Sequence, residues 1–160
     1  MLIGPMGSGK TSFGKKLAKL LQLPFIDTDR EITRKHGPIP ELFANQGENY
    51  FRELETAALE SALKEGCVVA TGGGAVVREV NHALLQGAYV IYLRTNFEAV
   101  AGRLDTERRP LLAKDPDAWR KIFEERKHLY EGLADAVVDT AGRHADTVLA
   151  DLANLAGGVN

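Results

Sequence analysis

A phosphate-binding loop is the strongest chemical signal in the sequence. Residues 4–11 read Gly-Pro-Met-Gly-Ser-Gly-Lys-Thr and match the pattern G-x-x-x-x-G-K-[ST] between a short apolar run and an amphipathic stretch. Glycines in such a loop let backbone N–H groups turn toward phosphate oxygens, and a helix that starts there adds its positive dipole end. The pattern predicts that Lys10 reaches the β- and γ-phosphates of a nucleotide and that the Thr11 hydroxyl binds Mg²⁺. An ordinary glycine-rich turn is the alternative, which the flanking pattern disfavours.

Two carboxylates and a run of glycines follow other apolar segments. Asp27 and Asp29 come directly after the apolar residues 24–26, and we expect one to face a metal and the other an acceptor. Alternatively, Asp29 only caps a helix over residues 30–36. The triplet Gly72, Gly73 and Gly74 is entropically costly unless the backbone must approach a small polar group closely, although a bare turn uses such glycines too.

Three arginines are candidates for binding an anion. Arg126 falls within the apolar stripe of a predicted long helix, where it either pairs with a carboxylate of the protein or awaits an anionic ligand. Arg52 has Glu48 and Glu55 at helical spacing, so a surface ion pair is the simple interpretation. Arg109 lies in a charged segment without periodicity, either as a solvated charge or as a clamp on the transition state.

Composition limits the possible classes of protein. The chain has 160 residues, of which 44% are hydrophobic and 26% charged, which predicts one globular domain over residues 1–160. The formal charge of −2 excludes a global positive field for nucleic acid. No apolar run has the length of a membrane helix, and the single cysteine fits a reducing compartment, so we expect a cytoplasmic protein.

The elements that must position these side chains alternate along the chain. Short apolar runs predict buried strands at residues 2–3, 24–26, 67–70, 89–93 and 136–138. Helical spacing predicts helices from Lys10, after Leu93 with Thr95 or Asn96 as its cap, and from Asp115 to about Ala134. Trp119 and Phe123 are expected in the core. We predict an α/β fold, a P-loop sandwich whose sheet is mostly parallel and whose ligands gather at the carboxyl ends of the strands.

The ordered series of motifs resembles the shikimate kinase family over almost the whole chain. Its residues are 4–11, 27–29, Phe43 with Gly47, Glu48, Phe51 and Arg52, then 72–76, 109–112, Arg126 with Tyr130, and 138–140. The resemblance implies a nucleoside-monophosphate-kinase-like three-layer αβα sandwich with about five strands. It also implies a monomer that transfers the γ-phosphoryl of ATP to the 3-hydroxyl of shikimate with the help of Mg²⁺.

The same resemblance implies a role for each candidate residue. Asp29 would act on the reacting hydroxyl, Asp27 would hold Mg²⁺ through water, and Arg109 would close over the phosphates with a lid at about residues 104–115. Shikimate would be bound by Asp29, Arg52, Gly73, Gly74 and Arg126. The nucleotide would be bound by Gly7, Ser8, Gly9, Lys10, Thr11, Ser12, Arg103, Arg109 and Arg143.

Two other functions fit parts of the sequence. One is a small P-loop kinase for another acceptor, such as gluconate or a nucleoside monophosphate. The other is a nucleotide-driven switch, which would give Asp29, Gly74 and Arg126 no common target. Paired arginines with a triple-glycine loop favour a compact hydroxylated carboxylate as the acceptor.

Overall fold

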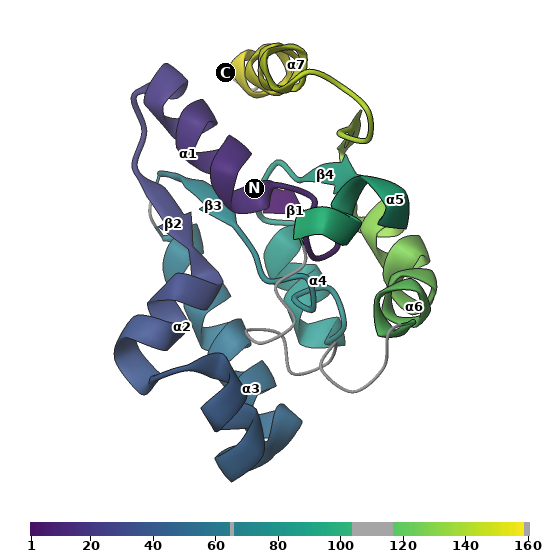
Figure 1. Cartoon of the computed structure of the whole chain (residues 1–160). Coiled ribbons are helices and arrows are strands. Elements are labelled where there is room, and N and C mark those ends of the chain that lie inside the picture. Colours follow the sequence, from purple (N-terminus) through teal and green to yellow (C-terminus); the bar gives the residue numbers. More distant parts are fainter. Residues whose placement is uncertain (65, 104–116, 159–160) are drawn as a thin grey trace.

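A five-stranded parallel sheet forms the centre of the computed structural model (Figure 1). The structure describes residues 1–64, 66–103 and 117–158. In the spatial order β2-β3-β1-β4-β5, every neighbouring pair is parallel. The strands are β1 (Leu2–Ile3), β2 (Phe25–Asp27), β3 (Val68–Ala70), β4 (Ile91–Arg94) and β5 (Ala136–Asp139). All five predicted strands are present, each within two residues of its expected ends.

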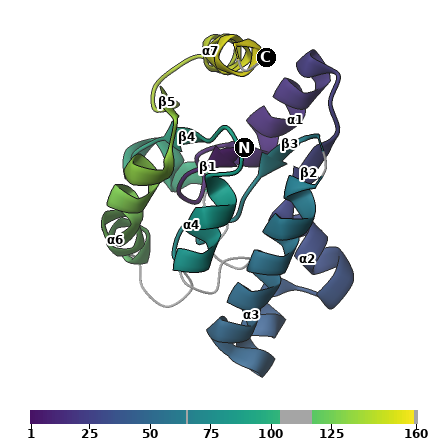
Figure 2. The same ribbon diagram turned by 180° about the vertical axis from the view of Figure 1, so that it is seen from behind.

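Helices cover both faces of the sheet (Figure 2). They are α1 (Lys10–Leu21), α2 (Thr28–His36), α3 (Ile39–Leu63), α4 (Glu79–Leu85), α5 (Phe97–Val100), α6 (Ala118–Leu133) and α7 (Ala145–Gly157), with a 3₁₀ turn at Ala101–Arg103. Helices α1 and α7 pack on one face, and α3, α4 and α6 pack on the other. This arrangement confirms the predicted αβα sandwich with a parallel sheet.

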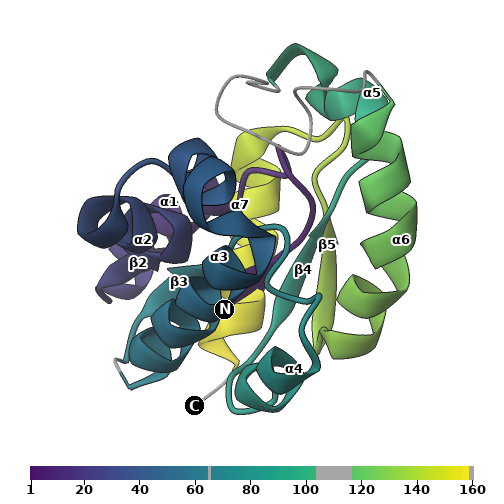
Figure 3. The same ribbon diagram turned by 90° about the horizontal axis from the view of Figure 1, so that it is seen from below.

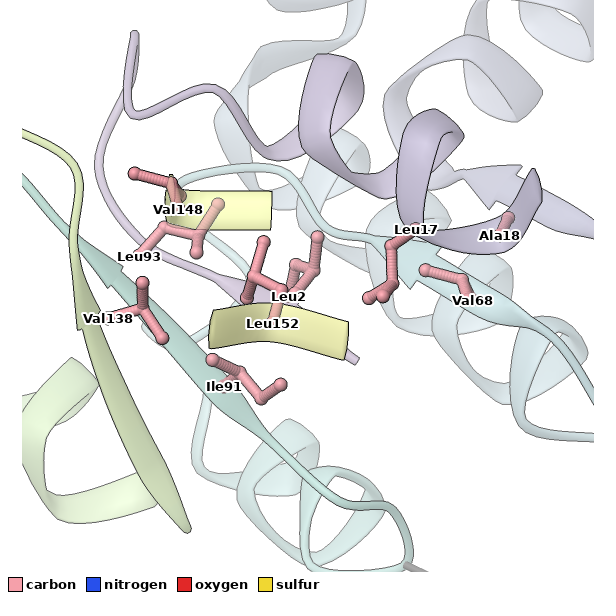
Figure 4. Packing of buried hydrophobic residues seen from close by; sticks show 9 residues of the cluster. All are labelled: Leu2, Leu17, Ala18, Val68, Ile91, Leu93, Val138, Val148 and Leu152. Atoms are coloured by element: carbon pink, nitrogen blue, oxygen red, sulfur yellow. The ribbon is translucent and has the colours of Figure 1, made fainter. Parts of the chain in front are cut away.

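Alternate residues of the central strands pack into two hydrophobic cores, one on each face of the sheet. Leu2, Ile91 and Leu93 join side chains of α1 and α7 in one buried cluster, shown in Figure 4. Ile3 and Tyr92 point to the opposite face and pack with residues of α3, α4 and α6. Because successive side chains of a strand face opposite sides, strands buried on both faces must be apolar throughout, as the sequence pattern indicated.

The N-terminal ends of α2 and α5 show which side chain caps each helix. The side chain of Asp27, rather than that of Asp29, caps α2, because Oδ1 of Asp27 accepts from the Arg30 amide at 3.1 Å. The capping interpretation of Asp29 was therefore wrong. At α5 the cap is Asn96, which accepts from the Ala99 amide at 2.9 Å.

The long helix α6 begins at Ala118, so the predicted start at Asp115 lies outside the described residues, as does the predicted lid at about 104–115. Trp119 is 2% exposed and lies in the core, as expected. No described helix is long and apolar enough to cross a membrane.

The strand order places the candidate loops together. The phosphate loop follows the central strand β1, the glycine triplet follows its neighbour β3, and Asp29 follows β2 on the far side of β3. Because the strands are parallel, these loops all leave the same edge of the sheet. In Figure 3 this edge is seen with α2 and α3 beside it.

Candidate active site

The phosphate loop is shaped by its glycines. Gly9 precedes α1 with φ 93°, in the left-handed region, and no side chain caps this helix end. Gly4 approaches β4 so closely that a methyl group on it would lie 2.6 Å from the Leu93 carbonyl oxygen. A helix end without a side-chain cap can offer its first amides to an anion.

Lys10 lies inside this loop. Its ammonium donates to the carbonyl oxygens of Gly4 at 2.7 Å and Pro5 at 2.8 Å, and the residue is only 9% exposed. The backbone thus holds the amine in the loop where the pattern places nucleotide phosphates.

Thr11 and Asp27 form a pair of oxygen donors beside the loop. The Thr11 hydroxyl donates to Oδ2 of Asp27 at 2.6 Å. Both residues line a cavity of about 970 Å³, together with Gly7, Gly9, Lys10, Ser12, Asp29 and Gly73 among the predicted site residues. A hydroxyl and a carboxylate suit Mg²⁺, which prefers oxygen ligands and keeps several waters. Within the described residues, no group of three or more His, Cys, Asp or Glu side chains forms a metal cluster.

The glycine triplet is the point at which the predicted acceptor residues meet. A methyl group on Gly72 would lie 2.6 Å from Oδ1 of Asp29 and 2.7 Å from Oε1 of Glu55, and one on Gly74 would overlap the guanidinium of Arg52. A side chain at Gly72 or Gly74 would have to displace these charged groups. We call Asp29, Arg52, Glu55, Gly72, Gly73, Gly74, Arg126 and Tyr130 the triplet cluster.

The phosphate loop touches the same triplet. A methyl group on Gly73 would lie 3.4 Å from the Met6 amide nitrogen and 3.5 Å from the Gly4 carbonyl oxygen. The amide of Gly72 donates to the buried Thr28 hydroxyl at 3.2 Å, which ties the triplet to the start of α2. The phosphate loop and the triplet cluster are therefore contiguous.

Arg52 pairs with both predicted glutamates, but it is buried. Its guanidinium lies 2.8 Å from Oε2 of Glu55 and 3.0 Å from Oε1 of Glu48, and Arg52 is 6% exposed. Burial lowers the pKa of Arg52, but Glu55 and Glu48 outweigh this and raise it. The interpretation as a surface pair was therefore wrong about the location and right about the partners.

Glu55 is the buried partner, at 1% exposure. Burial raises the pKa of its carboxyl, against the opposing charges of Arg52 and Arg126. Its second oxygen, Oε1, has no hydrogen-bond partner among the described residues and faces Gly72. Sequence spacing alone did not distinguish this residue from an exposed glutamate.

Arg126 is 8% exposed, and none of the ion pairs between described residues involves it. It lies beside the hydroxyl of Tyr130, whose pKa is raised to about 12 by burial, against the charge of Arg126 and a side-chain hydrogen bond from it. Tyr130 in turn donates to the Gly73 carbonyl oxygen at 2.5 Å. The alternative in which Arg126 awaits an anion stays a prediction, and among the described residues its charge also acts on the carboxyl of Glu55.

Arg52, Gly74 and Arg126 do not line the 970 Å³ cavity themselves. They are connected to the cavity by the glycine triplet. Arg52 lies against Gly74, and Arg126 is hydrogen-bonded to Tyr130, which donates to the carbonyl of Gly73 in the cavity wall. Ser8 is also buried behind the lining, at 2% exposure.

Three arginines predicted to bind the nucleotide lie outside the phosphate loop: Arg103, Arg109 and Arg143. Arg143 is not among the residues that line the cavity. Arg143 follows β5, where it pairs with Asp151 at 2.8 Å and donates to the Asp139 carbonyl at 3.2 Å. Arg103 ends the 3₁₀ turn, and Arg109 lies outside the described residues.

Sequence reasoning missed several supporting side chains. Asn81 is fully buried on α4, donates to the Ala75 carbonyl and accepts from the Thr56 hydroxyl, both at 2.8 Å, so it joins the triplet loop to α3. Trp119 uses its indole N–H to bind the Met6 carbonyl at 2.9 Å. No local pattern indicated these bonds, because Thr56 is 25 positions from Asn81 and Met6 is 113 positions from Trp119.

The parallel sheet, with the phosphate loop after its central strand and Lys10, Thr11 and Asp27 in place, defines a P-loop nucleotide-binding protein with a nucleoside-monophosphate-kinase-like fold. The structure of a deoxyadenosine kinase from M. mycoides with bound dCTP shares this fold, with a TM-score of 0.65, 15% identity and coverage of 99% of this chain and 100% of that one.

Closer relatives narrow the class. The family model described as Shikimate kinase matches residues 6–156, so the chain belongs to the shikimate kinase family. It is 45% identical to the shikimate kinase of Pseudomonas entomophila over 158 residues, 95% of this chain and 92% of that one. The shikimate kinase of Streptomyces coelicolor is 43% identical, with coverage of 92% and 89%.

A solved structure agrees with the family match and with the two sequence relatives. Shikimate kinase from Acinetobacter baumannii in complex with shikimate is similar to this chain, with a TM-score of 0.90, 36% identity and coverage of 99% of this chain and 92% of that one. The family and the fold class predicted from the sequence are confirmed.

Proposed function

We propose that this chain transfers the γ-phosphoryl group of ATP to the 3-hydroxyl of shikimate and releases shikimate 3-phosphate and ADP. The observation that carries the proposal is the glycine triplet. Gly73 lies against the backbone of the phosphate loop, while Gly72 and Gly74 lie against Asp29 and Arg52. A phosphoryl donor in the loop and an acid on the triplet would meet within one site. Family membership and the shikimate-bound relative support the choice of acceptor.

The phosphate loop binds ATP in this proposal. Amides of Gly7, Ser8, Gly9 and the first turn of α1, with the hydroxyls of Thr11 and Ser12, surround the phosphates. Lys10 exchanges its bonds to the Gly4 and Pro5 carbonyls for phosphate oxygens. Little covalent chemistry is needed from the protein, because phosphoryl transfer depends mainly on positioning and on neutralising negative charge.

Thr11 and Asp27 hold Mg²⁺ in the proposal. The fit rests on their donor chemistry and on the 2.6 Å contact between them, which places both oxygens on one side of the cavity. When bound, the ion neutralises charge on the β- and γ-phosphates. Asp27 keeps its place because the Arg30 amide binds its other oxygen.

The triplet cluster binds the acid. The guanidiniums of Arg52 and Arg126 bind the carboxylate, and both side chains are buried. Among the described residues Arg52 already has ion pairs with Glu48 and Glu55, whereas Arg126 has none. The amides of Gly73 and Gly74 are offered to substrate oxygens. A carboxylate that enters supplies the charge that offsets the burial of Arg126.

Asp29 acts on the acceptor hydroxyl. Its Oδ1 is buried and aimed at Gly72, in the cavity that also contains Lys10. A carboxylate there orients the hydroxyl and takes its proton as the oxygen attacks phosphorus. We further propose that Arg109 neutralises the transferring phosphoryl, that Arg103 and Arg143 contact adenine, and that the protein is a cytoplasmic monomer that does not bind nucleic acid.

A coupled ADP-release assay tests the acceptor. Shikimate, quinate, gluconate and nucleoside monophosphates are offered side by side with ATP and Mg²⁺. We expect turnover with shikimate to exceed turnover with every other compound by at least about 10², because nucleoside monophosphates lack a carboxylate and because quinate and gluconate present their hydroxyls in a different geometry. Preference for gluconate or a nucleotide would contradict the proposal. Phosphate release without any acceptor would favour the nucleotide switch.

A further inference from the structure

Helix α6 is bonded to both loops of the active site. The indole N–H of Trp119 donates to the Met6 carbonyl in the phosphate loop at 2.9 Å. Three turns later the Tyr130 hydroxyl donates to the Gly73 carbonyl in the glycine triplet at 2.5 Å. These residues are 2% and 1% exposed, so neither donor has ready access to water as a replacement partner.

The two acceptors are neighbours in space. Met6 and Gly73 belong to loops after different strands, yet a methyl group on Gly73 would lie 3.4 Å from the Met6 amide nitrogen. Helix α6 therefore holds the junction of the two loops at two points. Met6 and Gly73 also both line the cavity, so a shift of either changes the shape of the site.

Arg126 lies between the two donors on the same helix face. Residues 119, 126 and 130 are separated by seven and four positions, close to whole turns of an α-helix. The rise along the helix is about 10 Å from Trp119 to Arg126 and about 6 Å from Arg126 to Tyr130. One rigid element thus carries the carboxylate-binding arginine and both bonds that fix the loops.

We propose that Trp119 and Tyr130 are positioning residues, which fix the phosphate loop and the glycine triplet at a set distance from Arg126. Trp119 orders the nucleotide side through Met6, and Tyr130 orders the acid side through Gly73 and its contact with Arg126. Neither side chain takes part in the chemistry. This inference rests on the proposed function, since it assigns the two sides to ATP and shikimate.

Two variants that remove the donors and keep an aromatic ring at each position test it. Trp119→Phe keeps an aromatic ring in the stack with Phe123, whose centroid is 5.0 Å away, and loses the N–H. We expect its Kd for ADP, measured by calorimetry, to rise about three- to tenfold, the scale of one lost hydrogen bond. Its KM for shikimate stays within about twofold of the wild-type value. Tyr130→Phe shows the reverse, with the larger change in the KM for shikimate.

Each variant has a matched control in the same aromatic pair. Tyr92→Phe removes a buried hydroxyl that has no hydrogen-bond partner among the described residues, and its ring stacks on Tyr130 at 5.3 Å. Phe123→Leu disturbs the packing around Trp119 and keeps the indole N–H. We expect both controls to change the unfolding temperature without separating the two ligands.

The outcomes are distinct. Unchanged binding in Trp119→Phe and Tyr130→Phe, or equal changes for both ligands, would overturn the inference. So would controls that reproduce the same separation, since packing would then explain it. If wild type uses an acceptor other than shikimate, the proposed function fails. The effect of Trp119→Phe on ADP binding still tests the nucleotide side, because calorimetry with ADP needs no acceptor.

Discussion

The phosphate loop and the triplet cluster differ in how far apart their residues lie in the sequence. The loop is continuous, from residue 4 to residue 11, and its geometry follows from its own glycines and the start of α1. The triplet cluster draws on α2, α3, the loop after β3 and α6, with members from Asp29 to Tyr130. The first is a local structure, whereas the second exists only when the fold is complete.

This difference has a functional consequence. A change in the phosphate loop should affect any nucleotide-dependent step, while a change in the triplet cluster should affect the acid and leave ATP binding intact. Single substitutions in the triplet cluster test whether the two regions are separable in this way.

Asp29→Asn should have the largest effect. We expect kcat to fall by about 10² or more, the usual scale for loss of a positioned acid or base, while the Kd for ADP stays within about twofold. Steady-state ADP release and calorimetry measure the two quantities. Glu31→Gln, on the same helix with an exposed partner in Arg34, is the control. A nearly normal kcat would remove Asp29 from the chemistry.

Arg126→Ala should separate the two substrates. We expect the KM for shikimate to rise about 10- to 100-fold, since hydrogen bonds between charged groups are each worth about 1.5–3 kcal/mol. The KM for ATP should change by less than about twofold. Arg120→Ala removes an exposed arginine of α6 that pairs with Glu98, and serves as the control. Equal effects on both KM values would show that the two regions are not independent.

Gly74→Ala tests how closely the triplet cluster is packed. The added methyl overlaps the Arg52 guanidinium, which two glutamates hold in place. Displacing that guanidinium should raise the KM for shikimate about tenfold, the effect of one weakened charged contact. Gly132→Ala is the control, because a methyl there meets nothing within 4 Å. A wild-type KM in Gly74→Ala would mean that Arg52 moves without loss.

Glu55→Gln should show its effect in the pH dependence of stability. Burial raises the pKa of Glu55 above its usual value near 4.5, so the folded protein binds this proton more tightly than the unfolded chain. The contribution to stability is fully present below the usual value and is lost as the pH rises through the folded pKa. We therefore expect the unfolding free energy of wild type, relative to Glu55→Gln, to fall as the pH rises above about 4.5.

Urea unfolding at a series of pH values measures this difference. Glu48→Gln, which removes the exposed partner of Arg52 and keeps Glu55, is the control. A constant difference between wild type and Glu55→Gln over the acidic range would contradict the assignment.

The sequence predicted the local features well for a physical reason. The loop 4–11 and the five strands are specified by residues close together in the chain, so pattern and structure agree. The family resemblance grouped the distant residues of the triplet cluster, but it did not give their contacts. Glutamate three residues after arginine looks the same on a surface and in a core, so the burial of Glu55 was not foreseen. Trp119 was expected in the core, yet its bond to Met6 spans 113 positions, which no spacing rule covers.

The amine of Lys10, seated on the Gly4 and Pro5 carbonyls, has a further consequence for the protein before ATP arrives. These two bonds link the first residue of α1 to the start of the loop, so they hold the loop in one shape without a nucleotide. The incoming triphosphate then exchanges partners with a single ammonium group, and the loop need not be rebuilt at every turnover.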